Sequence, residues 1–273
     1  AGALLDALAP FAKYKVSMVY NERNRDMMKQ IPYGLTDFAR IQKDNYYYVD
    51  KTMFIERIEM QPAYLFLIRP RRFGKSLTLA MLEAYYDVVY ANDFDELFGH
   101  LYIGQHPTPK HNCYLIMRFN FSEVSSNVNE VERSFKLHCC SKLRDFVFKY
   151  EDLLGKEIWD VLDEEIQQDP GAFLSAINSY ASRKGNLPIY LLIDEYDNFT
   201  NTILATYGTE FYRTTTHGEG FIRGFFNVIK AAATGNGSAL QRMFITGVSP
   251  VTMDDVTSGF NIGTNITIDT LFN

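Results

Sequence analysis

Residues 69 to 76 read Arg-Pro-Arg-Arg-Phe-Gly-Lys-Ser, and they follow an apolar run of strand length, Tyr-Leu-Phe-Leu-Ile, at residues 64 to 68. The next residues, 77 to 86, have the apolar spacing of a helix that packs on a sheet. A loop that wraps phosphate needs inward-turned backbone N–H groups and no side chain where it enters its helix, and Gly74 meets that need. Strand, loop and helix in this order predict a phosphate-binding loop.

Two residues of the loop add specific chemistry. Lys75 would reach the β and γ phosphates as a mobile positive charge, and the Ser76 hydroxyl suits one position of an octahedral Mg²⁺. The alternative is a Gly-Lys-Ser tripeptide that starts a helix without any ligand. The predicted nucleotide-binding residues are Arg71, Arg72, Phe73, Gly74, Lys75, Ser76 and Leu77.

Arg69 departs from the general pattern G-x-x-x-x-G-K-[ST], because it stands where the first glycine should be. A non-glycine residue avoids positive φ, and Pro70 disfavours helical backbone angles at the residue before it. We therefore expect Arg69 to be extended, with its side chain turned out of the loop. Arg71 and Arg72 are then expected to supply the extra positive charge.

Two adjacent acids, Asp194 and Glu195, close a second apolar run at residues 188 to 193, which is typical of a parallel strand buried on both faces. In a nucleotide hydrolase the first carboxylate can hold the Mg²⁺ shell while the second activates water beside the γ phosphate. We therefore predict Asp194 as a metal ligand with Ser76, and Glu195 as the catalytic base. An ordinary strand end with solvated acids is the alternative, and Asp197 is interpreted as a helix or turn cap.

A later strand ends in small polar residues, Ile-Thr-Gly-Val-Ser, at residues 245 to 249. If that strand lies between the other two, Thr246 or Ser249 would contact the γ phosphate or the attacking water. A Thr-Gly pair that only makes a turn is an equally good interpretation. On the first interpretation Thr246 joins Lys75 and Glu195 as a predicted catalytic residue.

Further arginines and tyrosines have weaker signals. Arg213 and Arg223 flank a predicted loop at residues 214 to 220 and could stabilise charge within the chain or across subunits, although solvated arginines are the simpler interpretation. The tyrosines at 46 to 48 could pack on adenine, but aromatic residues before a core strand usually belong to the core.

Composition limits the class of protein. The 273 residues are 47% hydrophobic with a net charge of -6, which fits a folded α/β domain and argues against a generally basic nucleic-acid surface. The three cysteines, Cys113, Cys139 and Cys140, show neither a disulfide pattern nor zinc spacing, so we expect a cytoplasmic protein. No apolar stretch approaches the roughly 18 residues of a membrane span.

Apolar periodicity along the rest of the chain alternates between strands and helices, which predicts a doubly wound parallel sheet. We expect a loosely attached leader at residues 1 to 30, and a domain from 31 to 273. Asp50 is predicted to cap the second helix. The expected helices cover 36–41, 51–60, 77–86, 127–150, 153–168, 171–183 and 220–233, and the expected strands or extended segments cover 46–49, 64–68, 113–121, 188–193, 242–246 and 265–269.

Five motifs in order resemble the bacterial AAA-ATPase-like family, whose phosphate loop usually begins Arg-Pro-Arg-Arg. The likeness covers roughly residues 31 to 273. The motifs are Ile-Pro-Tyr-Gly-Leu-Thr-Asp-Phe at 31–38, Tyr-Val-Asp-Lys-Thr at 48–52, the loop at 69–76, Leu-Ile-Asp-Glu-Tyr-Asp at 192–197 and Phe-Ile-Thr-Gly-Val-Ser at 244–249.

The resemblance implies ATP binding and a P-loop NTPase core of the additional-strand type, with strand order 5-1-4-3-2. Members of the family often carry a C-terminal PD-(D/E)xK nuclease-like domain, which here would lie beyond Asn273. A helical lid that completes the adenine site would lie there too, so we expect hydrolysis to require the full-length protein. The resemblance does not decide a cellular role.

Three functions remain in competition. The leading one is an ATP-binding, Mg²⁺-dependent ATPase module that couples nucleotide binding and hydrolysis to a partner domain. The others are a nucleotide-binding switch that does not hydrolyse, and a structural or interaction module whose loop keeps its shape but binds no nucleotide. A P-loop kinase or sulfotransferase-like fold fits less well, because the acidic pair ends a strand and another core strand follows. The sequence leaves open whether the protein forms a homo-oligomer and whether it handles DNA.

Overall fold

A computed structural model describes residues 29–185, 187–217, 220–249 and 262–269, so all but the last two residues of the predicted leader lie outside the described ranges. These ranges form an α/β fold around a five-stranded sheet in which every neighbouring pair is parallel. The strand order is β2-β3-β4-β1-β5, which reads 5-1-4-3-2 from the other edge. The strands are β1 Tyr64–Ile68, β2 Leu115–Asn120, β3 Ile189–Asp194, β4 Leu240–Gly247 and β5 Thr264–Asn265.

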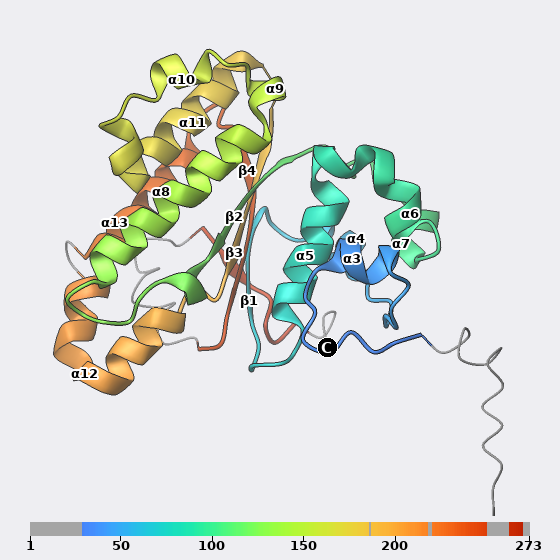
Figure 1. Ribbon diagram of the computed structural model, residues 1–273, viewed down its shortest axis with the longest axis horizontal. Helices are drawn as coiled ribbons and strands as arrows, with labels where there is room; N and C mark the ends of the chain where they lie inside the picture. The colour runs from blue at the N-terminus through green and yellow to red at the C-terminus, as the bar shows by residue number, and fades with distance from the viewer. Residues whose placement is uncertain (1–28, 186, 218–219, 250–261, 270–273) are drawn as a thin grey trace, which may run out of the picture.

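Helices cover both faces of the sheet, which confirms the predicted α/β class with a parallel sheet (Figure 1). On one face lie α3 Phe38–Lys43, α4 Phe54–Met60, α5 Lys75–Tyr86, α6 Phe94–Phe98 and α7 Tyr102–Gln105. On the other side lie α8 Val131–Lys149, α9 Glu151–Leu154, α10 Ile158–Val161, α11 Pro170–Lys184, α12 Asn198–Thr216 and α13 Phe221–Thr234. Short 3₁₀ helices are η2 Val88–Asp93, η3 Phe121–Glu123 and η4 Ile166–Gln168.

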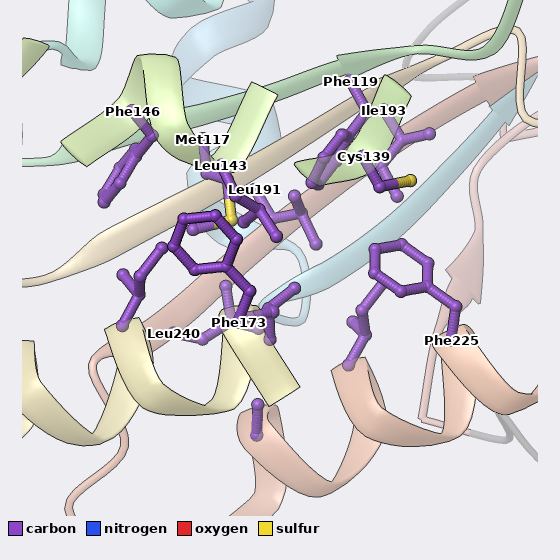
Figure 2. Close-up of a cluster of buried hydrophobic side chains, with 14 of the residues drawn as sticks. Met117, Phe119, Cys139, Leu143, Phe146, Phe173, Leu191, Ile193, Phe225 and Leu240 are labelled. Atoms are coloured by element: carbon purple, nitrogen blue, oxygen red, sulfur yellow. The ribbon is translucent and has the colours of Figure 1, made fainter. Parts of the chain in front are cut away.

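Alternate residues of each central strand supply two separate cores. In β3, Leu191 and Ile193 belong to the cluster beneath α8, α11 and α13, whereas Tyr190 and Leu192 belong to the cluster beneath α5. Figure 2 shows the first cluster, in which Phe225 of α13 packs edge-on against Phe119 of β2. Burying one such side chain stabilises the fold by about 1.5–3 kcal/mol, so a strand buried on both faces is strongly fixed.

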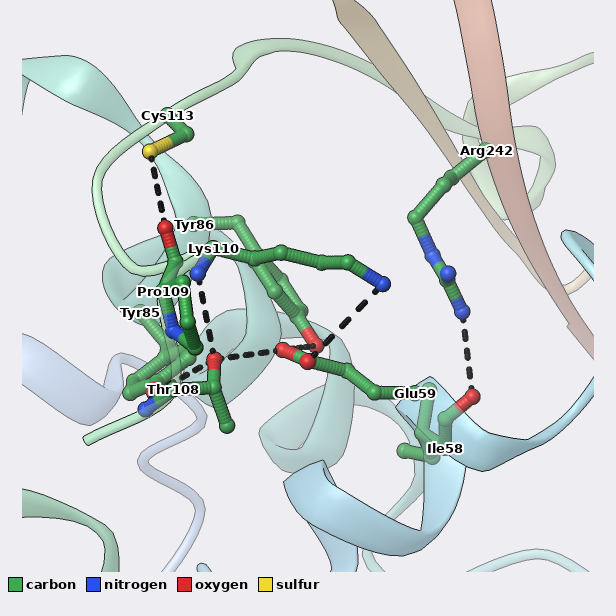
Figure 3. A network of polar contacts seen from close by, with 9 residues as sticks. All are labelled: Ile58, Glu59, Tyr85, Tyr86, Thr108, Pro109, Lys110, Cys113 and Arg242. Atoms are coloured by element: carbon green, nitrogen blue, oxygen red, sulfur yellow. Dashed lines mark hydrogen bonds and ion pairs between the residues drawn. The ribbon is translucent and has the colours of Figure 1, made fainter. Parts of the chain in front are cut away.

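A network of polar contacts lies at the N-terminal end of the central strand β4. Arg242 donates from Nη2 to the Ile58 carbonyl at 3.0 Å, while Glu59 accepts from the Tyr86 hydroxyl at 3.0 Å and from the Thr108 hydroxyl at 2.7 Å (Figure 3). These contacts join α4, the end of α5 and the segment after α7 to the sheet. These contacts satisfy Glu59 and one Arg242 nitrogen, whereas Arg242 Nε and the Tyr190 hydroxyl are buried without a hydrogen-bond partner among the described residues.

Several expected elements differ from the observed ones in their bounds. The first helix begins at Phe38, because Asp37 caps it by accepting from the Arg40 amide at 3.0 Å. The second begins at Phe54, and the expected capping role of Asp50 is wrong: this carboxylate accepts from the Thr52 amide at 2.8 Å, in the turn before the helix. Residues 46 to 49 join no strand.

Two long predicted helices are shorter or broken. The helix expected at 127–150 is α8, which begins at Val131. The helix expected at 153–168 is wrong, since Gly155 adopts a φ of 85° and the segment divides into α9, α10 and η4. By contrast, the helix expected at 171–183 is α11, where Asp169 accepts from the Ala172 amide at 2.7 Å and caps the first turn.

The remaining predicted elements occur in the expected order, whereas α6, α7 and α12 were not predicted. The strand expected at 113–121 is β2, and the one expected at 265–269 is the two-residue β5. The cysteines at 113, 139 and 140 are free thiols. Within the described ranges, no helix combines the length and the hydrophobicity required to cross a bilayer.

Candidate functional site

The loop at residues 69 to 74 joins β1 directly to α5. Gly74, which immediately precedes the helix, has a φ of 76° in the left-handed region, and Arg72 has a φ of 69°. A Cβ at position 74 would meet no atom within 4 Å, so the backbone angle and not crowding favours glycine there. The predicted order of strand, loop and helix is present, with the N-terminus of α5 at the end of the loop.

Arg69 is held at the edge of the sheet. Its backbone N–H donates to the Gly247 carbonyl of β4 at 3.1 Å, and its guanidinium donates to the Thr267 carbonyl beyond β5. Its φ is not positive. The guanidinium is thus directed to the segment after β5, and its expected orientation away from bound phosphates stays a prediction.

Lys75 is the first residue of α5 and is buried, with only 6% of its surface exposed. Its Nζ donates to the carbonyls of Arg69 and Pro70, at 3.1 and 3.2 Å. No carboxylate within the described ranges forms an ion pair with it. The ammonium group thus lies inside the loop and is held by backbone oxygens alone.

The other predicted nucleotide-binding residues lie around this lysine. Arg71, Arg72 and Phe73 are exposed, whereas Ser76 and Leu77 are half-buried in the first turn of α5. The exposed arginines place positive charge at the rim of the loop. A bound anion would meet backbone amides, one buried ammonium and two exposed guanidinium groups.

β4 lies between β1 and β3, as the interpretation of Thr246 required. Asp194 ends β3 with 1% of its surface exposed, and its Oδ1 accepts from the Thr246 hydroxyl at 2.6 Å. In the register of β1 and β4, Thr246 lies opposite Leu67, two residues before Arg69. The sheet therefore brings the acidic strand end and the polar strand end together beside the phosphate loop.

Glu195 is half-buried and adopts a φ of 52°, which is uncommon for a residue with a side chain. Nothing in its sequence context indicates this conformation. Because backbone angles of this kind gather at functional sites, the observation singles out Glu195 from an ordinary solvated strand end.

Asp197 was expected to be a helix or turn cap, and it does occupy the N-cap position of α12. Its side chain, however, makes no capping hydrogen bond to that helix. Its carboxylate instead accepts from the backbone amides of Val248 and Ser249, after β4, at 3.0 and 2.5 Å. Ser249 is therefore fixed by its backbone to this carboxylate. A separation of 52 residues concealed the contact in the sequence.

A cavity of about 770 Å³ opens beside the loop on the α5 side of the sheet. Tyr47 and Tyr48 line it, whereas Tyr46 does not. The ring of Tyr48 packs edge-on against that of Phe38, with 5.4 Å between the ring centroids. Burial raises the pKa of the Tyr48 hydroxyl. Other lining residues come from the loop, α4 and α5: Arg69, Pro70, Phe73, Gly74, Phe54, Leu77, Thr78 and Met81.

The arginines that were expected to flank a loop lie in helices instead. Arg213 is an exposed residue of α12, which runs to Thr216, and Arg223 is a half-buried residue of α13. The loop predicted from residue 214 thus begins only at His217. Neither arginine forms an ion pair within the part of the chain that the structure describes.

Comparison with known proteins identifies a family for this chain. A family described as "Predicted AAA-ATPase" matches residues 32–257. A curated protein named "Uncharacterized protein in vnfD 5'region", from Azotobacter chroococcum mcd 1, is 53% identical over 55 residues, which are 20% of this chain and 11% of that protein. No solved structure matches the chain. Because the family match spans the phosphate loop, the acidic strand end and Thr246, the chain belongs to the predicted AAA-ATPase family.

Proposed function

We propose that the protein binds Mg·ATP in the loop at residues 69–76 and hydrolyses it, as a module that drives a partner domain. The buried ammonium of Lys75 carries this proposal. It has carbonyl partners and no carboxylate among the described residues, so its positive charge is not neutralised. A buried cation of this kind is stabilised by an anion, and the β and γ phosphates would replace the carbonyls of Arg69 and Pro70.

The loop conformation supports the same ligand. Gly74 turns the chain into a 12-residue helix whose first amides and dipole favour negative charge. Arg71 and Arg72 are exposed and would add charge to the phosphates from the rim. Phe73 and Leu77 line the adjoining cavity, where they would contact the nucleoside.

The cavity has the size and the apolar lining expected for a nucleoside base. Tyr47 lies on its wall with 55% of its surface exposed, and Phe73 of the loop is 65% exposed. Aromatic rings left in water beside a phosphate loop gain contact area when a flat base stacks on them. We therefore place adenine in this cavity, with the triphosphate running towards Lys75.

Magnesium would be held by Ser76 and Asp194. Among the described residues no cluster of three or more histidine, cysteine, aspartate or glutamate side chains is arranged for a metal. Mg²⁺ at a nucleotide keeps several waters and takes phosphate oxygens, so one hydroxyl and one nearby carboxylate suffice. The ion would neutralise charge on the phosphates and strengthen their binding.

Glu195 would accept the proton of the attacking water, and Thr246 would orient that water or the γ phosphate. The hydroxyl of Thr246 already donates to Asp194 at 2.6 Å, which places a polar side chain of β4 beside the acidic strand end. The positive φ of this half-buried acid supports its role, because unusual backbone angles of this kind gather at functional sites.

Steady-state hydrolysis and ATP binding in the full-length protein test this proposal together. Glu195→Gln should retain ATP affinity and lose about 10²–10⁴ in kcat, because the amide keeps the shape of the side chain but cannot accept the proton. Asp163→Asn is the matched control: its carboxylate accepts from the Ile166 amide at 2.8 Å near α10, at the end of the sheet remote from the loop (Figure 1). A Glu195→Gln variant with the parent rate would refute the catalytic role of Glu195, whereas a parent that binds ATP without hydrolysing it would favour the non-hydrolysing switch.

A further inference from the structure

The carboxylate of Asp197 is completely buried, and within the described ranges no lysine, arginine or histidine pairs with it. It accepts from N–H groups only. Val248 N lies 3.1 Å from Oδ1, and Ser249 N and Asn201 Nδ2 lie 2.5 and 2.8 Å from Oδ2. A buried carboxylate is tolerated when hydrogen bonds satisfy it, so these three donors are held firmly around one side chain.

A second group of contacts joins the same two segments. Tyr196 donates from its backbone to the Thr246 carbonyl at 3.1 Å and from its hydroxyl to the Ser249 carbonyl at 2.8 Å. Gly247 fits between them without a side chain: a Cβ there would lie 2.2 Å from Tyr196 Cε1 and 2.8 Å from Asp197 Oδ1. The end of β4 is therefore packed closely against the residues that follow β3, with no room for a side chain at position 247.

This packed segment also reaches the phosphate loop, because the Gly247 carbonyl accepts from the Arg69 amide at 3.1 Å. Glu195 lies inside the same arrangement, between Asp194, which Thr246 holds, and Asp197, which Val248 and Ser249 hold. A φ of 52° at a residue with a side chain persists only where its neighbours determine it. Both flanking carboxylates supply that constraint.

We propose that Asp197 is a positioning residue for the ATPase, a role that rests on the proposed function above. Its side chain is fully buried, so it would not contact the nucleotide itself. Its carboxylate fixes the segment after β4 and the first turn of α12, and through them it keeps the strained backbone that aims Glu195 at the γ phosphate. Of the three acids at residues 194, 195 and 197, the last one thus supports catalysis without contacting the reacting atoms.

Asp197→Asn in the full-length protein tests the proposal. The amide replaces one accepting oxygen by a donor, which must then face Val248 N, Ser249 N or Asn201 Nδ2. We expect kcat per bound ATP to fall about 10- to 100-fold, because small displacements of a catalytic group are costly. The KM for ATP and the number of ATP molecules bound per chain should stay near the parent values, since the phosphate loop is intact.

A second substitution separates positioning from general damage to the fold. In Asp197→Asn/Asn201→Asp the new amide nitrogen, in the place of Oδ2, can donate to the new carboxylate. Its oxygen, in the place of Oδ1, again accepts from the Val248 amide, whereas the Ser249 amide stays without this acceptor. We expect this double variant to recover part of the lost kcat. Asp163→Asn, remote from the site, should match the parent.

The outcomes distinguish this proposal from the one on which it rests. A full-length parent that neither binds nor hydrolyses ATP would overturn the proposed function and this role with it. A parent that hydrolyses ATP while Asp197→Asn keeps its kcat would overturn the positioning role alone. Equal loss of kcat and of bound ATP per chain, unrelieved in the double variant, would also overturn it, because that is the result of a purely structural aspartate.

Discussion

At the scale of single residues, we expect the negative charge of Asp194 to strengthen Mg²⁺ binding at the site. Its side chain is 1% exposed and accepts from the Thr246 hydroxyl, so an asparagine can keep this hydrogen bond and lose only the charge. We predict that Asp194→Asn raises the Mg²⁺ concentration needed for half-maximal ATP binding about tenfold, a change of about 1.4 kcal/mol. ATP titrations at a series of Mg²⁺ concentrations measure it.

The control for that series is binding without magnesium, where the variant should match or slightly exceed the parent because a carboxylate repels free phosphate. Superimposable magnesium curves for Asp194→Asn and the parent would remove this residue from the metal site and leave Ser76 as its predicted protein ligand.

Residue types at this site could be read from the sequence, but their backbone angles and distant partners could not. Gly74, Lys75 and Ser76 form a contiguous signal, and Asp194 and Glu195 end an apolar run. The positive φ of Glu195 has no local cause, because contacts to β4 hold it. By contrast, the absence of a positive φ at Arg69 could be predicted, because Pro70 restricts the backbone angles of the residue before it.

At the scale of elements, buried strands were easier to predict than the helices around them. β1 coincides with its apolar run, because a strand buried on both faces needs continuous hydrophobicity. α12 was not predicted: it is rich in threonine, and Gly208 interrupts it with a φ of 81°. Tertiary packing of residues such as Phe199 and Ile203 stabilises this helix against its weak local preference.

An ion pair between Lys149, which is exposed near the end of α8, and Asp87, which is buried at the end of α5, gives a prediction at this scale. Lys149 Nζ lies 2.7 Å from Asp87 Oδ2 and 3.2 Å from Glu83 Oε1, and Asp87 has no exposed surface. Lys149→Met would leave that carboxylate buried without its cation, and we expect the free energy of unfolding to fall by about 3 kcal/mol at pH 7.5. Urea unfolding measures the loss.

The loss of unfolding free energy in Lys149→Met should be smaller at low pH. Burial raises the pKa of Asp87, with the Lys149 ammonium opposing that rise, so the pKa rises further in the variant. A carboxyl whose folded-state pKa is raised binds its proton more tightly when folded, and the buried charge disappears as the pH falls through that pKa. The deficit is therefore full at pH 7.5 and smaller at pH 5.

The surface pair of Lys136 and Glu132 on the same helix provides the control, because both side chains are exposed. Lys136→Met should change stability by less than about 0.5 kcal/mol at either pH. A Lys149→Met deficit that is equally large at pH 5 and pH 7.5 would contradict the buried-charge explanation.

At the scale of the whole molecule, three segments far apart in the sequence meet at one edge of the sheet: the loop after β1, the acids after β3 and the polar end of β4. The parallel order made this meeting predictable, since the carboxyl ends of parallel strands share one edge. The cavity beside the loop was not predictable, because its walls come from separate turns and helices that only the packed fold brings together.

Calorimetric titration with Mg·ATP tests the central claim that this edge is a nucleotide site. The parent should bind one Mg·ATP, and Lys75→Ala should bind it about 30- to 150-fold more weakly, the value of about 2–3 kcal/mol for a charge-assisted contact. Lys156→Ala, which removes an exposed charge between α9 and α10, should bind like the parent. Equal affinity of Lys75→Ala and the parent, or no binding by the parent, would contradict the assignment of residues 69–76 as a phosphate-binding loop.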